Sequence, residues 1–200
     1  MHFQFGVLVA AFVIIGLAEL PDKTMIASLI LATRSKPFPV WVGASGAFLV
    51  HVTIAVAAGG ALALLPHQVV QGISAAAFAA AGVWLLRSQP PVEQEAEAVE
   101  AELGAKPPPN AAAAMSRAFA VIFLGEWGDV TQIATANLSA RYDAPLSVGV
   151  GALLGLMAAA GIAVTAGRLL LRVVPLYVVR RVAGGLLVLL AIATVAEAVA

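Results

Sequence analysis

The sequence predicts an all-α membrane protein with six transmembrane helices, arranged as two inverted three-helix repeats. The first observation is composition: of 200 residues, 62% are hydrophobic and 11% are charged, whereas an ordinary soluble domain carries about a quarter charged residues. The second is a series of apolar runs long enough to cross a bilayer as helices. The third is an acidic motif that occurs twice, each time in the middle of an apolar run.

Charge and cysteine content exclude several classes of function. The formal net charge is zero, which argues against nucleic-acid binding. The chain has no cysteine, so disulfides, thiolate metal sites and cysteine nucleophiles are excluded. The first apolar run begins almost at Met1 and lacks the basic region of a secretory signal. We therefore interpret it as a membrane helix of the mature protein.

Proline and charged residues divide the apolar sequence into spans. Breaks are predicted at Arg34–Pro37, Leu65–His67, Arg141–Pro145 and Val174–Pro175. Several runs exceed the roughly 20 residues that a straight span needs, so some helices are expected to be tilted, kinked or broken. The first helix of each repeat, which carries the motif, is the one expected to be broken. The predicted spans are 5–32, 39–64, 67–87, 114–139, 146–171 and 175–198.

A segment rich in glutamate and proline separates the two halves. Residues 88–112 hold five glutamates between Pro90-Pro91 and Pro107-Pro108-Pro109. We interpret this acidic segment as a solvated linker whose Glu/Ala part is helical only transiently. The predicted domains are a first three-helix repeat (1–87), the linker (88–112) and a second three-helix repeat (113–200).

The distribution of basic residues predicts the orientation in the membrane. Nine Lys and Arg residues lie near the loops that follow spans one, three and five, against Arg141 alone on the other side. The positive-inside rule therefore places both termini outside and the linker in the cytoplasm. The predicted location is the plasma membrane of a bacterium.

The two halves resemble each other. A shift of 107 residues superposes Glu19 on Glu126 and Asp22 on Asp129, and after one deletion Gly43 meets Gly149. Each half has three predicted spans, an odd number, so the two copies must cross the membrane in opposite directions. Inverted repeats of this kind are typical of secondary transporters, whose substrate sites lie near the midplane where the repeats meet.

The repeated motif brings acidic residues into the bilayer. A charge at the centre of a membrane helix costs about 2.5–3.5 kcal/mol. An interaction must therefore offset the cost of four carboxylates, and binding a cation is the simplest one. Helix residues three apart share a face, and antiparallel helices can bring all four toward one axis. Pro21 and Gly128 occupy matching positions, where each can bend or unwind the helix and free carbonyl oxygens. The copies read Glu19-Leu20-Pro21-Asp22-Lys23-Thr24 and Glu126-Trp127-Gly128-Asp129-Val130-Thr131.

The donors around the motif favour a hard divalent cation. Carboxylates, the hydroxyls of Thr24 and Thr131 and the amide of Gln132 suit calcium, magnesium or manganese. Zinc and copper sites usually include Cys or His, and the only mid-span histidine is His51. Metal binding requires ionised carboxylates, so protons compete with the cation. This competition is the physical basis of cation/proton exchange.

The doubled motif resembles E-x-G-D-K/R-T/S, the signature of the Gdt-type cation/proton exchanger family, which includes the Golgi manganese/calcium transporter of eukaryotes. The resemblance covers nearly the whole chain: two three-span repeats, a central linker and one motif in the first span of each repeat. It implies that the chain is a bacterial member that exports manganese, or calcium, in exchange for protons. It also implies a cation site formed by Glu19, Asp22, Glu126 and Asp129.

Two positions depart from the family pattern. Pro21 stands where the family usually has Gly, and Val130 replaces the usual Lys or Arg, whereas Lys23 keeps its place. With both basic residues, the four carboxylates would leave a formal charge of minus two, which matches one divalent cation; here the sum is minus three. We hypothesise that one carboxylate stays protonated at neutral pH, or that the proton stoichiometry is altered.

The polar residues around the motif have alternative interpretations. Lys23 either neutralises Asp22 or acts as a tethered cation that occupies the site when metal is absent. Thr24, Thr131 and Gln132 either support the site or bond local backbone groups. His51 is more typical of a packed, hydrogen-bonded histidine than of a proton relay. Glycines of the second and fifth spans are expected to permit close helix packing: Gly43, Gly46, Gly149, Gly151 and Gly155.

The leading prediction is thus a secondary transporter, not an enzyme, whose partners are a divalent cation, protons and the lipid bilayer. No cofactor is expected beyond the transported cation, and a homo-oligomer is left open. The acids could instead form a structural network between helices, in a membrane assembly factor that transports nothing. An intramembrane aspartyl protease is disfavoured because its G-x-G-D pattern needs a glycine where Glu126 stands. A channel is the near alternative within transport.

Overall fold

The computed structural model describes residues 3–20, 23–87, 92–103, 106–173 and 176–199, and the regular structure in these ranges is helical throughout. The predicted all-α class is therefore confirmed. The helices are α1 (Phe5–Glu19), α2 (Lys23–Arg34), α3 (Pro37–Leu62), α4 (His67–Arg87), α5 (Val92–Leu103), α6 (Ala111–Gly125), α7 (Val130–Tyr142), α8 (Pro145–Val173) and α9 (Leu176–Val199).

The helix ends lie close to the predicted breaks. α3 begins at Pro37, in the first turn, where the missing proline N–H removes no helical hydrogen bond. α7 ends before Asp143, whose backbone is left-handed with φ of 46°, and α8 begins at Pro145. Asn110 caps α6, because its side chain accepts a hydrogen bond of 2.8 Å from the backbone N–H of Ala113.

Among the described residues, fewer than six helices satisfy the length and composition requirements for a membrane span. In the described ranges, three helices are long and apolar enough on their own: α3, Gln68–Arg87 of α4 and Pro145–Ala166 of α8. A fourth span results if α1 and α2, whose directions differ by 70°, are taken together. The first and fourth predicted spans are each divided between two helices, which is why their parts are short. The count of six spans stays a prediction.

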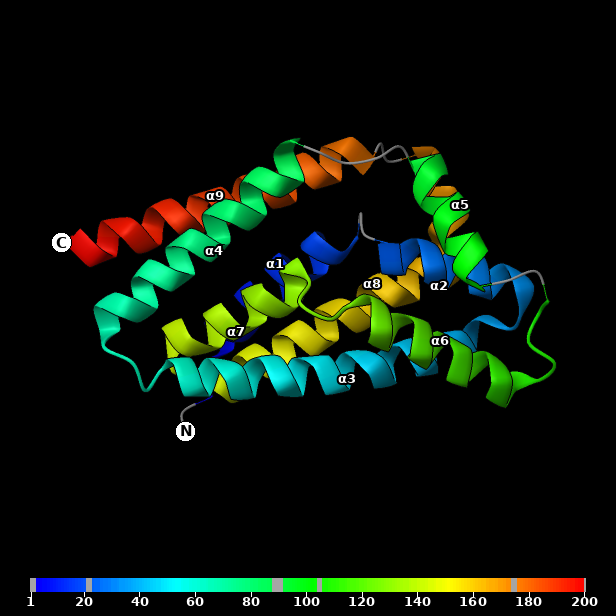
Figure 1. The fold of residues 1–200 in the computed structure, drawn as a ribbon, viewed down its shortest axis with the longest axis horizontal. Helices are drawn as coiled ribbons and strands as arrows, with labels where there is room; N and C mark the ends of the chain where they lie inside the picture. Colours follow the sequence, from blue (N-terminus) through cyan, green and yellow to red (C-terminus); the bar gives the residue numbers. More distant parts are fainter. Residues whose placement is uncertain (1–2, 21–22, 88–91, 104–105, 174–175, 200) are drawn as a thin grey trace.

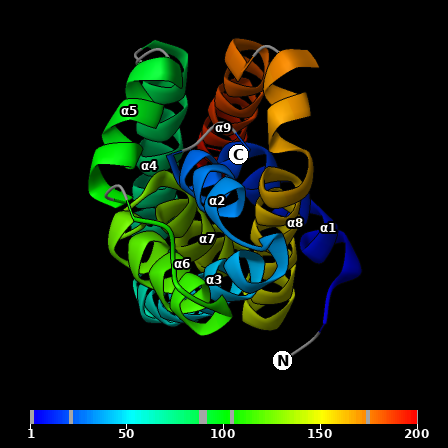
Figure 2. The same ribbon diagram turned by 90° about the vertical axis from the view of Figure 1, so that its right-hand side faces the viewer.

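α3 and α8 pack against each other. Figure 2 shows α6 on the outer side of α3 and α1 on the outer side of α8, and both pairs are in contact. α4 and α9 run side by side (Figure 1), and they contact α7 and α1 respectively. The contacts relate equivalent helices of the two halves, because α1 packs on α8 as α6 packs on α3, and α2 packs on α8 as α7 packs on α3.

Glycines lie where these helices come closest to one another, as predicted. A Cβ atom added to Gly43 on α3 would lie 2.1 Å from the carbonyl oxygen of Met115 on α6. One added to Gly151 on α8 would lie 2.3 Å from the carbonyl oxygen of Leu8 on α1. Gly155 makes a similar contact, at 2.7 Å, with the carbonyl oxygen of Phe12. At Gly46 and Gly149 the nearest atoms are side-chain carbons at 3.4 and 3.3 Å.

Part of the predicted linker packs on the helical core. α5 contacts α2, and its Val99 and Leu103 are buried in a cluster with Ile26 and Ile30. Arg34 Nη2 of α2 lies 3.3 Å from Glu100 Oε1 in a partly exposed ion pair. We expected a solvated segment because glutamates dominate it. The missed signal is the spacing of Val99 and Leu103, four residues apart on one helix face.

We predict that Gly43→Ala destabilises the protein by about 1–3 kcal/mol, the usual cost of overpacking, because the new methyl group collides with the α6 backbone. The measurement is thermal unfolding in detergent. Gly60→Ala is the matched control: Gly60 lies on the same helix and has no atom within 4 Å of the added Cβ, so stability should stay equal or rise slightly. Equal melting temperatures for the two variants would contradict the packing argument.

Candidate metal centre

The second acidic motif lies in a break between α6 and α7. α6 ends at Gly125, and Asp129 is the N-cap of α7. Between them Gly128 has a φ of +74°, a left-handed conformation that glycine adopts without steric cost. The interruption expected at this glycine is therefore present, and it turns the motif backbone out of helical geometry.

Three of the four predicted carboxylates lie together. One carboxylate oxygen from each of Glu19, Glu126 and Asp129 lies within 4.8 Å of the others. Glu19 is 1% exposed and Glu126 3%, and Asp129 is half-buried. Glu19 ends α1, whereas the other two flank the α6–α7 break, so the cluster joins the two halves of the chain. The fourth carboxylate, Asp22, and Pro21 lie outside the described residues.

The motif threonines bond to two different carboxylates of this cluster. The Thr24 hydroxyl donates a hydrogen bond to Glu19 Oε1, from α2 to the end of α1. Thr131 donates to Asp129 Oδ2 from its backbone N–H at 3.1 Å and from its hydroxyl at 3.3 Å. These bonds orient the carboxylates. Lys23 is the first residue of α2, and its side chain is outside the described part of the structure.

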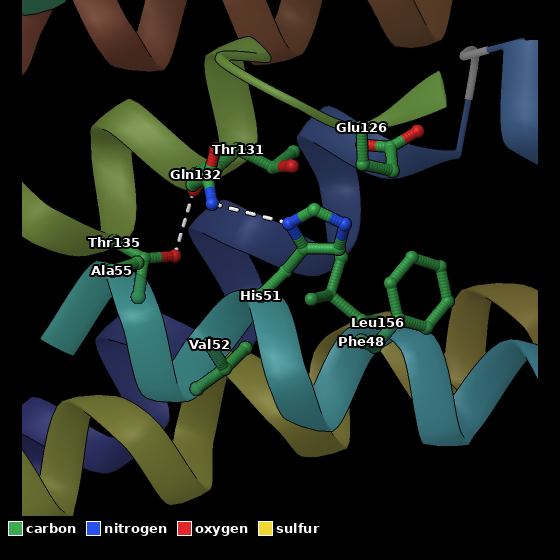
Figure 3. A pocket seen from close by; sticks show the side chains of 9 residues that line it. All are labelled: Phe48, His51, Val52, Ala55, Glu126, Thr131, Gln132, Thr135 and Leu156. Atoms are coloured by element: carbon green, nitrogen blue, oxygen red, sulfur yellow. Dashed lines mark hydrogen bonds between the residues drawn. The ribbon is translucent and has the colours of Figure 1, made fainter. Parts of the chain in front are cut away.

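A cavity of about 10 Å³ adjoins Glu126, enough for roughly one water-sized atom. Its polar wall is formed by Glu126, His51, Thr131, Gln132 and Thr135. Figure 3 shows these side chains around the space between α3 and the segment from Glu126 into α7, with apolar residues of α3 and α8 on the other side. The buried carboxylate of Glu126 thus belongs both to the acidic cluster and to this cavity.

His51 is buried on α3 and hydrogen-bonded at both ring nitrogens. Nε2 lies 3.0 Å from the carbonyl oxygen of Phe123, and Nδ1 lies 3.1 Å from Nε2 of Gln132 (Figure 3). Oε1 of Gln132 accepts a bond of 2.8 Å from the backbone N–H of Gly128. The interpretation of His51 as a packed, hydrogen-bonded histidine is confirmed.

An aromatic cluster around His51 was missed from the sequence. The ring of His51 lies 5.2 Å from that of Phe123 and 5.6 Å from that of Trp127, and Phe119 stacks on Phe123. Phe119, Phe123 and Trp127 are spaced by four residues; the first two share one face of α6, and Trp127 lies in the turn that follows the helix. That spacing is the signal that could have found the cluster.

The comparisons with known proteins agree on one family. The family of the divalent cation/proton antiporter GDT1 matches residues 7–92 and 114–200. The chain belongs to this family. The membership confirms the resemblance inferred from the motif and makes the chain a member of a family of membrane cation/proton antiporters.

Individual relatives support the same assignment. A Vibrio cholerae protein described as "Putative manganese exporter" is 31% identical over 94% of this chain and 90% of its own length. A GDT1-like protein of Synechocystis is 32% identical over 80% of this chain and 82% of its own length. The chloroplastic PAM71-homolog of Arabidopsis thaliana is 28% identical, and the chain covers 58% of it. No solved structure gives a significant match.

We predict that Gly128→Ala weakens the site, since an alanine in the left-handed region costs about 1–2 kcal/mol and the turn that presents Asp129 must change. The expected result is a lower divalent-cation affinity, measured by titration of the purified protein with Mn²⁺. Gly125→Ala provides the control, because both glycines have open space around an added Cβ and only Gly128 has a positive φ. Equal affinities in the two variants would show that the turn does not depend on glycine.

Proposed function

We propose that this protein exports a hard divalent cation, manganese foremost, from the bacterial cytoplasm in exchange for protons. The observation that carries the proposal is the meeting of Glu19, Glu126 and Asp129, whose carboxylate oxygens lie within 4.8 Å of one another. The description of the Vibrio cholerae relative as a manganese exporter favours manganese. Calcium suits the same oxygen donors and is the second candidate.

The chemistry of the cluster supports exchange rather than simple binding. Three ionised carboxylates this close, two of them almost completely buried, repel one another strongly in a medium of low dielectric constant. A divalent cation relieves the repulsion, and so do protons. We propose that Glu19, Asp22, Glu126 and Asp129 form one cation site, and that protons and the cation replace each other there. Thr24 and Thr131 support the site by orienting the carboxylates of Glu19 and Asp129, respectively.

Alternating access is the proposed mechanism. The helix contacts are consistent with two inverted repeats, because α1 packs on α8 as α6 packs on α3. Gly151 and Gly43 approach the carbonyl groups of Leu8 and Met115, and these two carbonyl groups are 107 residues apart, the same shift that superposes the two motifs. The glycines are 108 residues apart, two residues away from the alignment that pairs Gly43 with Gly149. With the cation held between the halves, a rocking motion of one half against the other exposes the site to each side in turn. We place the termini outside and α5 in the cytoplasm.

The test of the site is Mn²⁺ uptake into inverted membrane vesicles under a proton gradient. Because each carboxylate supplies charge and oxygen ligands, we expect Glu19→Gln, Glu126→Gln, Asp129→Asn and Asp22→Asn each to reduce uptake at least tenfold. Glu97→Gln changes an exposed carboxylate on α5 and should leave uptake unchanged. Undiminished uptake by Glu126→Gln and Asp129→Asn, with normal folding, would reject the site and favour a structural network.

The pH dependence tests the competition and the effect of Val130. Since protons occupy the carboxylates at low pH, the apparent Mn²⁺ affinity should fall as pH falls and recover as pH rises. Val130→Lys restores the usual basic residue at the start of α7 and brings the formal charge of the site to minus two. We expect it to change the number of protons exchanged per cation, measured with a pH-sensitive dye in the vesicles. Identical coupling in wild type and variant would refute the charge argument.

A further inference from the structure

We propose that His51 and Gln132 are positioning residues of the transport site: together they hold the break between α6 and α7 in the shape that directs Glu126 and Asp129 toward the cation. This inference rests on the proposed function and adds residues that support the cation ligands. Neither side chain needs to touch the cation, since both act on the backbone around the two carboxylates.

The first argument concerns backbone hydrogen bonds. A helix interrupted inside a bilayer leaves carbonyl and N–H groups without helical partners, and lipid offers none. In a continuous helix the Phe123 carbonyl would accept from the N–H of Trp127, four residues on. Here it accepts from His51 Nε2 at 3.0 Å. On the other side of the turn, the N–H of Gly128 donates to Gln132 Oε1 at 2.8 Å.

The second argument is that each atom in this chain of bonds has one possible role. A carbonyl oxygen only accepts, so His51 Nε2 carries the proton and Nδ1 is left as an acceptor. Gln132 Oε1 is engaged by Gly128, so the amide Nε2 donates to His51 Nδ1, at 3.1 Å. The bonds therefore run without interruption from Gly128 through Gln132 and His51 to Phe123. With both nitrogens engaged, His51 acts through geometry.

The third argument is the place of these bonds relative to the carboxylates. Phe123 precedes Glu126 by three residues, and Gly128 directly precedes Asp129. The bonded chain therefore spans the segment that carries both acids. The ring of His51 also packs edge-on against Trp127, with centroids 5.6 Å apart and planes at 78°. Movement of His51 or Gln132 would displace the backbone on both sides of Glu126.

The half-site around the first motif has different residues at the equivalent positions. The shift of 107 that aligns the motifs places Met25 opposite Gln132, and the shift of 106 that follows the deletion places Met157 opposite His51. A thioether donates no hydrogen bond, so methionines cannot bridge a carbonyl and an N–H in this way. The link formed by His51 and Gln132 therefore serves the half-site of the second repeat.

The test replaces this pair with the methionines found at the equivalent positions around the first motif. His51→Met, Gln132→Met and the double variant are compared with wild type for Mn²⁺ transport in inverted vesicles, with folding followed by thermal unfolding. We expect KM for Mn²⁺ to rise about tenfold in each single variant, as for residues that orient metal ligands, with a smaller change in kcat. Because the two side chains form one link, the double variant should be no worse than either single variant. Faster amide hydrogen exchange at Gly128 should accompany the rise in KM, because its N–H loses its bond to Gln132.

Thr53→Val is the matched control on α3, because the Thr53 hydroxyl bonds only within its own helix, to the Leu49 carbonyl at 2.7 Å. Unchanged KM in His51→Met and Gln132→Met, or losses that add in the double variant, would overturn the inference while leaving the transport function intact. Failure of the proposed function would appear differently, as absent Mn²⁺ flux in wild type. If the methionine variants do not fold, His51→Gln and Gln132→Asn are measured instead. Because His51→Gln keeps an N–H donor, its KM for Mn²⁺ should lie between that of wild type and that of Gln132→Asn. A wild-type KM in both variants would also overturn the inference.

Discussion

Mutual repulsion between buried carboxylates is the constraint on which the rest of this structure depends. Glu19 and Glu126 are almost fully buried and lie close to Asp129, an arrangement that is unfavourable unless positive charge or protons enter the cluster. The fold keeps the acids together by anchoring each on a helix end rather than on a flexible loop. The need for a counter-charge connects this geometry to the cation/proton exchange of the family to which the chain belongs.

The broken helices place these acids. A continuous helix would direct Glu126 and Asp129 along one face, but the left-handed turn at Gly128 separates them into a helix end and an N-cap. The Asp129 side chain accepts from Thr131 at the start of α7, where the helix dipole favours negative charge. Local sequence therefore determines the orientation of each acid, and packing between α1, α7 and α8 brings the acids of the two halves together.

Much of this arrangement could be predicted from the sequence, because the signals are local or repeated. Proline and charge located the helix ends near Pro37 and Pro145, and the doubled motif identified Glu19, Glu126 and Asp129 as a group. Contacts between side chains distant in the sequence could not be predicted. The bond from His51 to Gln132 joins residues 81 positions apart, and nothing in either segment specifies the other. The burial of Val99 was missed because the surrounding glutamates outweigh two aliphatic residues in any compositional measure.

The glycine contacts between the halves have a mechanical consequence. At Gly43 and Gly151 one helix rests on the bare backbone carbonyl of another, so no protruding side chain is locked into a recess on the facing surface. Both contacts, α3 with α6 and α1 with α8, join one half of the chain to the other. A smooth interface of this kind opposes separation, since close approach maximises dispersion attraction, but it offers little resistance to sliding. At these two points the interface therefore resists separation of the helices more than sliding along them.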